Sequence, residues 1–233
     1  MTPPYCLSVS SILRLPPTSN FLATQVWPSS RVAARALEEY GESIGVNANN
    51  NPENKSVTTI CELGCGPGLP SLTAAVCAAR KTWKQQYPCQ VIATDIDDLA
   101  LELVMAAAEE QSLESVISTR NYDLIAAEWD GEWMDDVDLF VMSDVFESEA
   151  VAKGAAKLTQ RVLDNTNNDT YNTKLWVFAQ SDRAQREVYL QELRKIMSPK
   201  DEIISRGWIS FEDYDSKSRL WLCDLDETKV NYG

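Results

Sequence analysis

Three alternating glycines mark the stretch of this sequence that is best suited to hold a ligand. Residues 61–70 read CELGCGPGLP, and Gly64, Gly66 and Gly68 are three of only nine glycines in 233 residues. The β-branched run 57–60 before this stretch predicts a strand, and the apolar residues after it recur at helical spacing. A glycine turn between strand and helix lets bare backbone approach a ligand at the helix N-terminus. A purely structural turn is the alternative.

Acidic side chains follow most of the strands that the sequence predicts. In an open α/β sheet, ligands lie beyond the carboxyl ends of the strands, where the strand order reverses. The predicted strands end at Glu62 to Gly68, Asp95, Asn121 to Asp123, Asp144 and Gln180. Four of these five ends carry an acid and none carries a base. Such a site disfavours a polyphosphate and suits a ligand with free hydroxyls and a positive centre.

A dinucleotide-dependent enzyme is the first rival interpretation of the glycine turn. Its fingerprint is G-x-G-x-x-G, with an acidic residue about 20 positions further on. This chain has G-x-G-x-G instead, and Asp95 lies 31 residues beyond Gly64. Both differences argue against a nicotinamide dinucleotide.

The composition limits the partners of the chain. Its 21 basic and 35 acidic residues give a formal charge of -14. Such a surface repels phosphate backbones, so we expect no binding to nucleic acid and an attraction to a basic protein surface. No run approaches the ~18 apolar residues that a membrane helix needs, so we expect no membrane span. We expect a monomer.

The cysteine and histidine counts exclude several kinds of site. The chain contains six cysteines and no histidine, which removes Ser-His and Cys-His nucleophiles and His-ligated metals. Cys61 and Cys65 flank the glycines, but no second pair stands at zinc-ligand spacing, so we predict no metal site. Reduced thiols in the core are the better interpretation, and they suit an intracellular compartment.

Strand and helix patterns alternate along the chain and predict the fold. After an irregular or extended segment 1–25, we expect a single domain over 26–233. The predicted strands are 57–60, 90–94, 115–118, 137–142, 175–179, 202–211 and 219–225. Helical patterns follow the first, second, fourth and fifth of these strands, the loop 121–136 follows the third, and no helix fits between the last two. The prediction is therefore an α/β, Rossmann-like, doubly wound sheet of seven strands, mostly parallel, with a C-terminal antiparallel hairpin.

The N-terminus carries conflicting signals about location. Residues 1–37 contain no acid and many Ser and Thr, as organellar transit peptides do. However, Arg14 is the only basic residue before Arg31, which argues against such a peptide. We expect a cytoplasmic protein, with mitochondrial or plastid targeting as the alternative.

The glycine stretch also carries a resemblance to a known class of enzymes. Residues 62–68, ELGCGPG, resemble the first motif of seven-β-strand, S-adenosylmethionine-dependent methyltransferases. Within that class, VWPS at 26–29, ATD at 93–95 and SDVF at 143–146 resemble motifs of a protein lysine methyltransferase family. That family includes the electron-transfer-flavoprotein β-subunit lysine methyltransferase. The resemblance covers residues 26 to about 225 and implies S-adenosyl-L-methionine as cofactor and a protein with an exposed lysine as substrate.

The resemblance also implies a role for individual residues. The cofactor would be bound by Trp27, Glu62, Gly64, Gly66, Gly68, Asp95, Asn121, Asp123 and Ser143. The glycines would pack on its methionyl part, Asp95 would accept its ribose hydroxyls, Asn121 to Asp123 would lie beside its adenine, and Trp27 would wall the pocket. The alternatives are a helix cap for Asp95 and a packed surface anchor for Trp27.

The predicted catalytic residues are Asp144 and Phe146. In the family that the chain resembles, an acid at this place is usually followed three positions later by Tyr or Phe. This chain has Glu147 there, and Phe146 stands one position early. A lysine amine, with an ordinary pKa of about 10.4, must lose its proton before it attacks. We expect Asp144 to orient the amine and Phe146 to desolvate it, with the proton leaving to water.

Three functions remain open from the sequence alone. The first is a protein lysine methyltransferase, and the second is a small-molecule N-methyltransferase, which Glu147 keeps plausible. The third is a catalytically silent, cofactor-binding protein whose Trp- and acid-rich segment 121–136 docks a partner. A helix cap remains the alternative role of Asp144.

Overall fold

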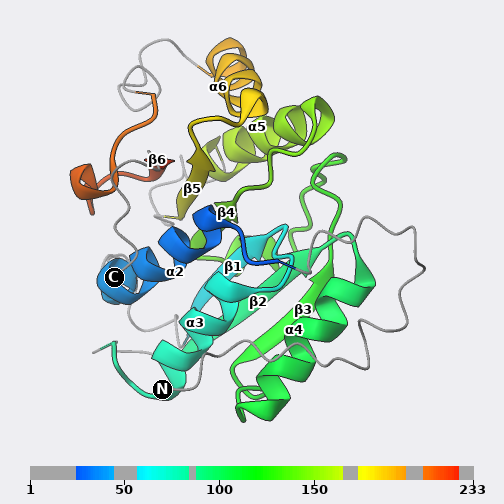
Figure 1. The fold of residues 1–233 in the computed structure, drawn as a ribbon, viewed down its shortest axis with the longest axis vertical. Helices are drawn as coiled ribbons and strands as arrows, with labels where there is room; N and C mark the ends of the chain where they lie inside the picture. The colour runs from blue at the N-terminus through cyan, green and yellow to red at the C-terminus, as the bar shows by residue number, and fades with distance from the viewer. Residues whose placement is uncertain (1–24, 45–56, 84–87, 165–172, 198–206, 226–233) are drawn as a thin grey trace.

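One six-stranded sheet organises the part of the chain that the structure describes (Figure 1). The computed structural model describes residues 25–44, 57–83, 88–164, 173–197 and 207–225. Except for its last residue, the predicted N-terminal segment 1–25 lies outside these ranges. The strands are β1 (Thr58–Leu63), β2 (Cys89–Asp95), β3 (Ile117–Asn121), β4 (Leu139–Ser143), β5 (Lys174–Gln180) and β6 (Leu220–Leu225). All neighbouring strands are parallel, in the order β3-β2-β1-β4-β5-β6.

Helices connect these strands, as the alternating sequence pattern predicts. They are α2 (Pro28–Tyr40), α3 (Leu69–Ala79), α4 (Asp98–Glu110), α5 (Glu149–Asp164) and α6 (Ala184–Ile196). Three short 3-10 helices, η2 (Gly41–Ser43), η3 (Met134–Asp136) and η4 (Phe211–Asp213), complete the described elements. None of the helices in the described ranges is long and apolar enough to cross a membrane.

The parallel α/β order is confirmed, but the prediction of seven strands with an antiparallel hairpin is wrong for the described residues. β6 pairs parallel to β5, from Leu175 opposite Leu220 to Gln180 opposite Leu225. Of the predicted strand 202–211, the described part contributes a single bridge between Ile209 and Cys223, which is also parallel. The connection from β5 to β6 contains α6, so it is long enough for the crossover that a parallel pair requires. An apolar run predicts a strand but not its direction.

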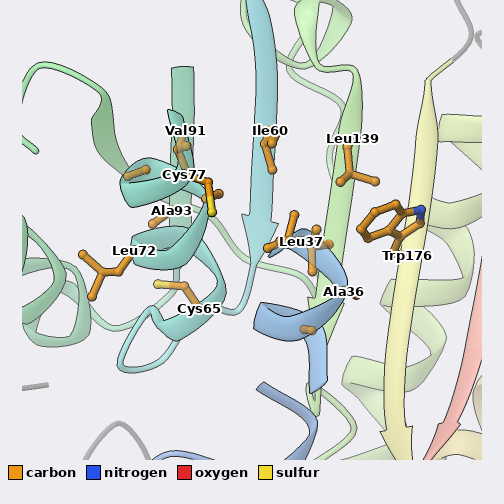
Figure 2. Packing of buried hydrophobic residues seen from close by; sticks show 14 of the residues in the cluster. Ala36, Leu37, Ile60, Cys65, Leu72, Cys77, Val91, Ala93, Leu139 and Trp176 are labelled. Carbon is orange, nitrogen blue, oxygen red and sulfur yellow. The ribbon is translucent and has the colours of Figure 1, made fainter. Parts of the chain in front are cut away.

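The first face of the sheet carries α2, α3 and α4. Its core contains Ile60, Leu139 and Trp176 from the strands, together with Leu37 of α2 and Leu72 of α3 (Figure 2). All five side chains are almost fully buried. Because successive side chains of a strand point to opposite faces, every second strand residue joins this core.

The opposite face is covered by α5 and α6, which lie side by side in Figure 1. Cys61, Phe140 and Val177 alternate with the residues of the first core and pack here with Leu158 of α5 and Tyr189 of α6. Both faces of the central strands are therefore apolar, which explains why the strands read as continuous hydrophobic runs. The five cysteines in the described ranges are buried and free, as predicted for core thiols.

Candidate active site

The described residues form a cavity of about 430 Å³ at the carboxyl ends of the strands. It lies at the point where the strand order reverses between β1 and β4, which is the usual ligand position in such sheets. Seven predicted site residues line it, namely Trp27, Gly64, Gly66, Asp95, Asp123, Ser143 and Asp144. Four predicted residues do not, namely Glu62, Gly68, Asn121 and Phe146. The lining residues that the sequence did not single out for a role include Ser30, Ile96, Ile125 and Arg183.

The glycine turn contributes bare backbone to the cavity at Gly66. Gly66 has a φ of +50°, and a Cβ atom placed on it would meet nothing within 4 Å. Gly68 has a different function, because a Cβ there would lie 2.5 Å from Cγ2 of Val104 in α4. Gly68 therefore allows the turn to pack against α4, whereas Gly66 leaves space for a ligand.

Asp95, the last residue of β2, fixes the glycine turn. One of its carboxylate oxygens accepts a hydrogen bond from the backbone N–H of Gly66 at 2.9 Å, and the other accepts from the N–H of Asp97 at 3.0 Å. The N-cap of α4 is Asp97, whose side chain accepts from the N–H of Leu99. The helix-cap role considered for Asp95 is thus filled by Asp97, and the Asp95 carboxylate lies in the cavity wall.

Apolar side chains form the rim of the cavity beside Asp95. Ile96 and Ile125 are 61% and 48% exposed, the two large hydrophobic side chains that stand out as exposed among the described residues. Asp123 also lines the cavity and lies between these two residues in the sequence. Its carboxylate accepts a hydrogen bond from the backbone N–H of Ile125 at 2.8 Å. Asn121 is outside the wall and donates to the carbonyl oxygen of Ile96 and to Asp98. Such side chains can contact a partly apolar ligand group.

Most of the Trp- and acid-rich segment 121–136 packs on itself and into the second core rather than over the cavity. The indole N–H of Trp129 donates to Asp135 and that of Trp133 donates to Asp130, both at 2.8 Å. Only the beginning of the segment, Tyr122 to Ile125, lines the cavity.

Glu62 lies in a buried hydrogen-bond network behind the cavity. It is 1% exposed and accepts from the N–H and the hydroxyl of Ser71 at 2.9 and 2.5 Å. The hydroxyl of Ser143 donates to the other carboxylate oxygen of Glu62 at 3.4 Å. The same hydroxyl lies 3.2 Å from the hydroxyl oxygen of Ser30. Burial raises the pKa of Glu62 to about 8, against the opposing effect of the hydrogen bonds from Ser71 and Ser143. Glu62 therefore joins β1, α3 and β4 and does not reach the cavity.

Asp144 forms a two-pronged ion pair with Arg183. The Nε and Nη2 atoms of Arg183 each donate to one Asp144 oxygen at 2.9 Å. The guanidinium also lies over the ring of Trp27, 4.8 Å from its centroid. The Asp144 side chain is fully covered, while that of Arg183 is 29% exposed. Asp144 has a φ of +57° and does not cap α5, which begins at Glu149.

Arg183 is the main residue that sequence reasoning missed. It lies in the turn directly after β5 and immediately before α6. Its position three residues after the end of a predicted strand could have identified it as a site residue, because parallel strands bring the residues that follow them to the same edge of the sheet.

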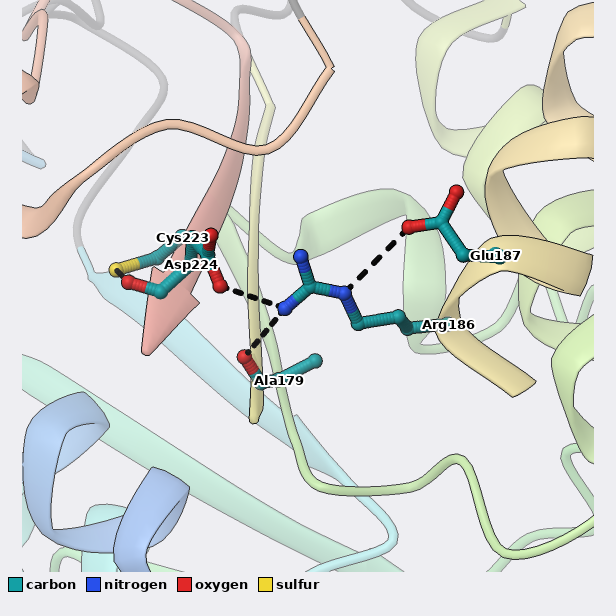
Figure 3. Close-up of polar contacts among 5 residues, drawn as sticks. All are labelled: Ala179, Arg186, Glu187, Cys223 and Asp224. Atoms are coloured by element: carbon teal, nitrogen blue, oxygen red, sulfur yellow. Dashed lines mark hydrogen bonds and ion pairs between the residues drawn. The ribbon is translucent and has the colours of Figure 1, made fainter. Parts of the chain in front are cut away.

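Arg186 anchors the first turn of α6, the helix that follows Arg183. Its guanidinium contacts Asp224 at 2.6 Å, the carbonyl oxygen of Ala179 at 3.4 Å and Glu187 at 3.5 Å (Figure 3). Asp224 and Ala179 belong to β6 and β5, so these contacts fix α6 against the sheet.

Phe146 occupies a different place from the one predicted. It is 1% exposed, and its ring packs 5.1 Å from that of Tyr189 and 6.1 Å from that of Trp208. The turn after β4 places Asp144 and Glu147 in the cavity wall and directs Phe146 into the α5–α6 core. The predicted desolvation of a substrate amine by Phe146 is therefore corrected to a packing role.

Negative charge dominates the cavity wall. It contains five carboxylates, from Asp95, Asp97, Asp123, Asp144 and Glu147, and one cation, Arg183. Glu147 is exposed, and its carboxylate makes no hydrogen bond or ion pair within the described ranges. The wall therefore favours positively charged ligands.

Residues 13–196 match the model of a protein family that is described as lysine methyltransferase. The chain is also similar to solved structures at low identity. The human methyltransferase 10 domain containing protein is 13% identical over 60% of each chain, with a TM-score of 0.39. PKMT2 from Rickettsia typhi, in complex with AdoHcy, is 16% identical over 55% of this chain and 22% of its own, with a TM-score of 0.39.

A putative class I S-adenosylmethionine-dependent methyltransferase from Listeria monocytogenes is 17% identical over 58% of this chain and 38% of its own, with a TM-score of 0.37. The chain thus spans between 22% and 60% of the length of these three structures. No curated protein matches the sequence.

Proposed function

The chain belongs to the lysine methyltransferase family and has S-adenosylmethionine as its cofactor, and we propose that it methylates lysine side chains of a basic protein. The observation that carries the proposal is the cavity itself, where the bare backbone of Gly66 meets a wall of five carboxylates. A cationic donor and a cationic acceptor are both attracted to such a wall.

The residues present fit the cofactor. The cavity volume of about 430 Å³ lies within the usual range of small-molecule sites, about 300–1,000 Å³. The open side of Gly66 would receive the methionyl part, and the carboxylate of Asp95 would accept the ribose hydroxyls. Ile96 and Ile125, with Asp123 between them in the chain, would hold the adenine ring. When bound, the cofactor supplies an activated methyl group on a sulfonium.

The acceptor would bind at the end of β4. The carboxylates of Asp144 and Glu147 would attract the lysine ammonium and orient its nitrogen. The amine must then lose its proton to water. Its removal from water favours the neutral form that can attack, whereas the carboxylates and the face of the Trp27 ring favour the ammonium. Alignment is the main contribution of this site, so the transfer needs no histidine.

A test of this function follows the methyl group. The purified protein is mixed with radiolabelled S-adenosylmethionine and a cell extract that has been freed of small molecules. Label in protein bands that requires intact Asp144 supports lysine methylation, and mass spectrometry then identifies the modified side chain. Undiminished transfer by a folded Asp144→Ala variant contradicts the role of Asp144.

A small-molecule N-methyltransferase is the second candidate, and one observation favours it. Glu147 presents a carboxylate that has no partner among the described residues, in the part of the wall where the family that the chain resembles usually has an aromatic ring. Label that appears only in a soluble small-molecule fraction, when that fraction is restored, identifies this second function. Tight cofactor binding with no transfer to either fraction identifies a catalytically silent binding protein.

A further inference from the structure

We propose that Arg183 determines acceptor specificity by occupying, in the free protein, the place that the acceptor cation takes in the complex. The inference rests on the proposed function and deepens it. The place is defined by the carboxylate of Asp144 and the ring of Trp27, and we call it the cation seat. The acceptor's alkylammonium group displaces the Arg183 guanidinium from this seat.

The cation seat has the two features that recognise an alkylammonium group. A carboxylate provides charge and hydrogen-bond acceptors, and the face of an indole ring attracts a cation within about 6 Å of its centroid. Arg183 uses both features at once, with two bonds of 2.9 Å to Asp144 and a distance of 4.8 Å to the Trp27 ring. All three residues line the large cavity, so the seat opens onto the proposed donor site.

A cationic partner stabilises the carboxylate of Asp144. Its side chain is fully covered, and a covered carboxylate without a partner is strongly unfavourable. Displacement of one cation by another reduces this cost, because Asp144 exchanges one cationic partner for another when the acceptor binds. A neutral or anionic acceptor provides no such replacement, so exchange at the seat selects for positively charged acceptors.

The Arg183 side chain can leave the cation seat without movement of α6. Its side chain is 29% exposed, and within the described ranges its guanidinium contacts Asp144 and Trp27. Arg186, one turn further along, is 9% exposed and binds Asp224 of β6. The helix is therefore held by Arg186, and Arg183 is free to rotate toward solvent.

The exchange fits into a balanced transfer. The ammonium enters the seat as Arg183 leaves, loses one proton to water, and attacks the methyl carbon as a neutral amine. When bound, the cofactor would supply this methyl group from its sulfonium, and its sulfur would keep the electron pair of the broken S–CH₃ bond as the N–CH₃ bond forms. The methylated ammonium is again a cation, and Arg183 returns to Asp144 when it departs.

Nuclear magnetic resonance of arginine side chains tests the exchange in the wild-type protein. The Nε–H signal of Arg183, assigned by its loss in an Arg183→Lys variant, reports the bond to Asp144. The protein is saturated with S-adenosylhomocysteine and titrated with Nα-acetyl-lysine methylamide. We expect this signal to shift or broaden as the lysine probe binds. The uncharged norleucine analogue should leave it unchanged.

Binding measurements on variants provide the second arm. In Arg183→Met the seat is empty, so the lysine probe should bind at least ten times more tightly than to the wild type. Arg194→Met is the matched control, since Arg194 is an exposed arginine of the same helix that does not line the cavity. It should bind the probe as the wild type does. S-adenosylhomocysteine affinity, measured for all variants, reports an intact fold.

Three results overturn the inference. They are an unchanged Arg183 signal at saturating probe, weaker probe binding by a folded Arg183→Met variant, and no probe binding by any variant. Methylation of extract proteins is scored separately. If methyl transfer occurs while the Arg183 signal is unchanged, the proposed function is supported and the cation-seat inference is contradicted. If the probe displaces Arg183 but no methyl transfer occurs, the inference is supported and the proposed function is contradicted.

Discussion

The carboxylate of Asp95 and the backbone amide of Gly66 are joined by a hydrogen bond of 2.9 Å. The bond connects the end of β2 to the turn after β1, and both residues line the large cavity. One side chain thus sets the shape of the glycine turn and provides the acidic group expected to meet the ribose. Cofactor binding and the conformation of the glycine turn therefore both depend on Asp95.

Substitution of Asp95 by alanine should weaken cofactor binding. A hydrogen bond to a charged group contributes about 1.5–3 kcal/mol, and 1.4 kcal/mol corresponds to a factor of ten. We therefore expect the dissociation constant of S-adenosylhomocysteine, measured by calorimetry, to rise about 10- to 100-fold. Asp138→Ala is the control, because Asp138 accepts from the N–H of Thr59 at the opposite edge of the sheet. Unchanged affinity in folded Asp95→Ala would refute the assignment.

Alanine at Gly66 and at Gly68 should have different effects. Both glycines have positive φ, which costs a non-glycine residue about 1–2 kcal/mol. At Gly66 the added methyl group enters the cavity, so cofactor affinity should fall at least tenfold with little further loss of stability. At Gly68 it clashes with Val104, so the free energy of unfolding should fall further.

A second substitution separates the two causes of destabilisation in Gly68→Ala, which are the positive φ and the clash with Val104. Val104→Ala removes the clashing methyl groups, so it should restore part of the stability lost in Gly68→Ala. Chemical denaturation of the single and double variants measures this coupling. Simple addition of the two losses would show that the clash is not the cause.

The buried carboxyl of Glu62 should make stability depend on pH. Its folded-state pKa is raised from 4.5 to about 8, so between these values the folded protein binds a proton that the unfolded chain has lost. The contribution of Glu62 to stability is therefore present below pH 4.5 and is lost as the pH rises to about 8. One pKa unit corresponds to about 1.4 kcal/mol.

Glu62→Gln, which resembles the protonated acid, should remove this dependence. The variant should become more stable relative to wild type as the pH rises from 5 to 8, when unfolding is followed in denaturant at several pH values. The difference between the two proteins cancels the contributions of other groups. A constant difference across this range would contradict the raised pKa.

Phe146 should influence stability rather than acceptor binding. It is almost fully buried between Tyr189 and Trp208, and truncation of such a phenylalanine to alanine costs about 3–5 kcal/mol. Phe146→Leu should lose less and should keep the KM of the acceptor in the methyl-transfer assay. A raised KM with unchanged stability would instead return Phe146 to the substrate site.

The sequence by itself determined the glycine turn, the acidic strand ends and the parallel α/β order. These features are local or periodic. Gly64, Gly66 and Gly68 lie within five consecutive residues of the chain, and a buried strand needs an apolar run wherever it lies. For this reason Asp95, Asp123 and Asp144 could be placed at one edge of the sheet from their positions after predicted strands.

Only the tertiary structure decided the direction of β6, the inward position of Phe146 and the pairing of Asp144 with Arg183. An apolar run is compatible with either strand direction, and in the structure β6 pairs parallel to β5, which the long connection through α6 allows. Phe146 and Glu147 are adjacent in the chain, so only the path of the turn determines which one reaches the cavity. Asp144 and Arg183 are 39 residues apart, and packing of α6 against the sheet brings their charges together.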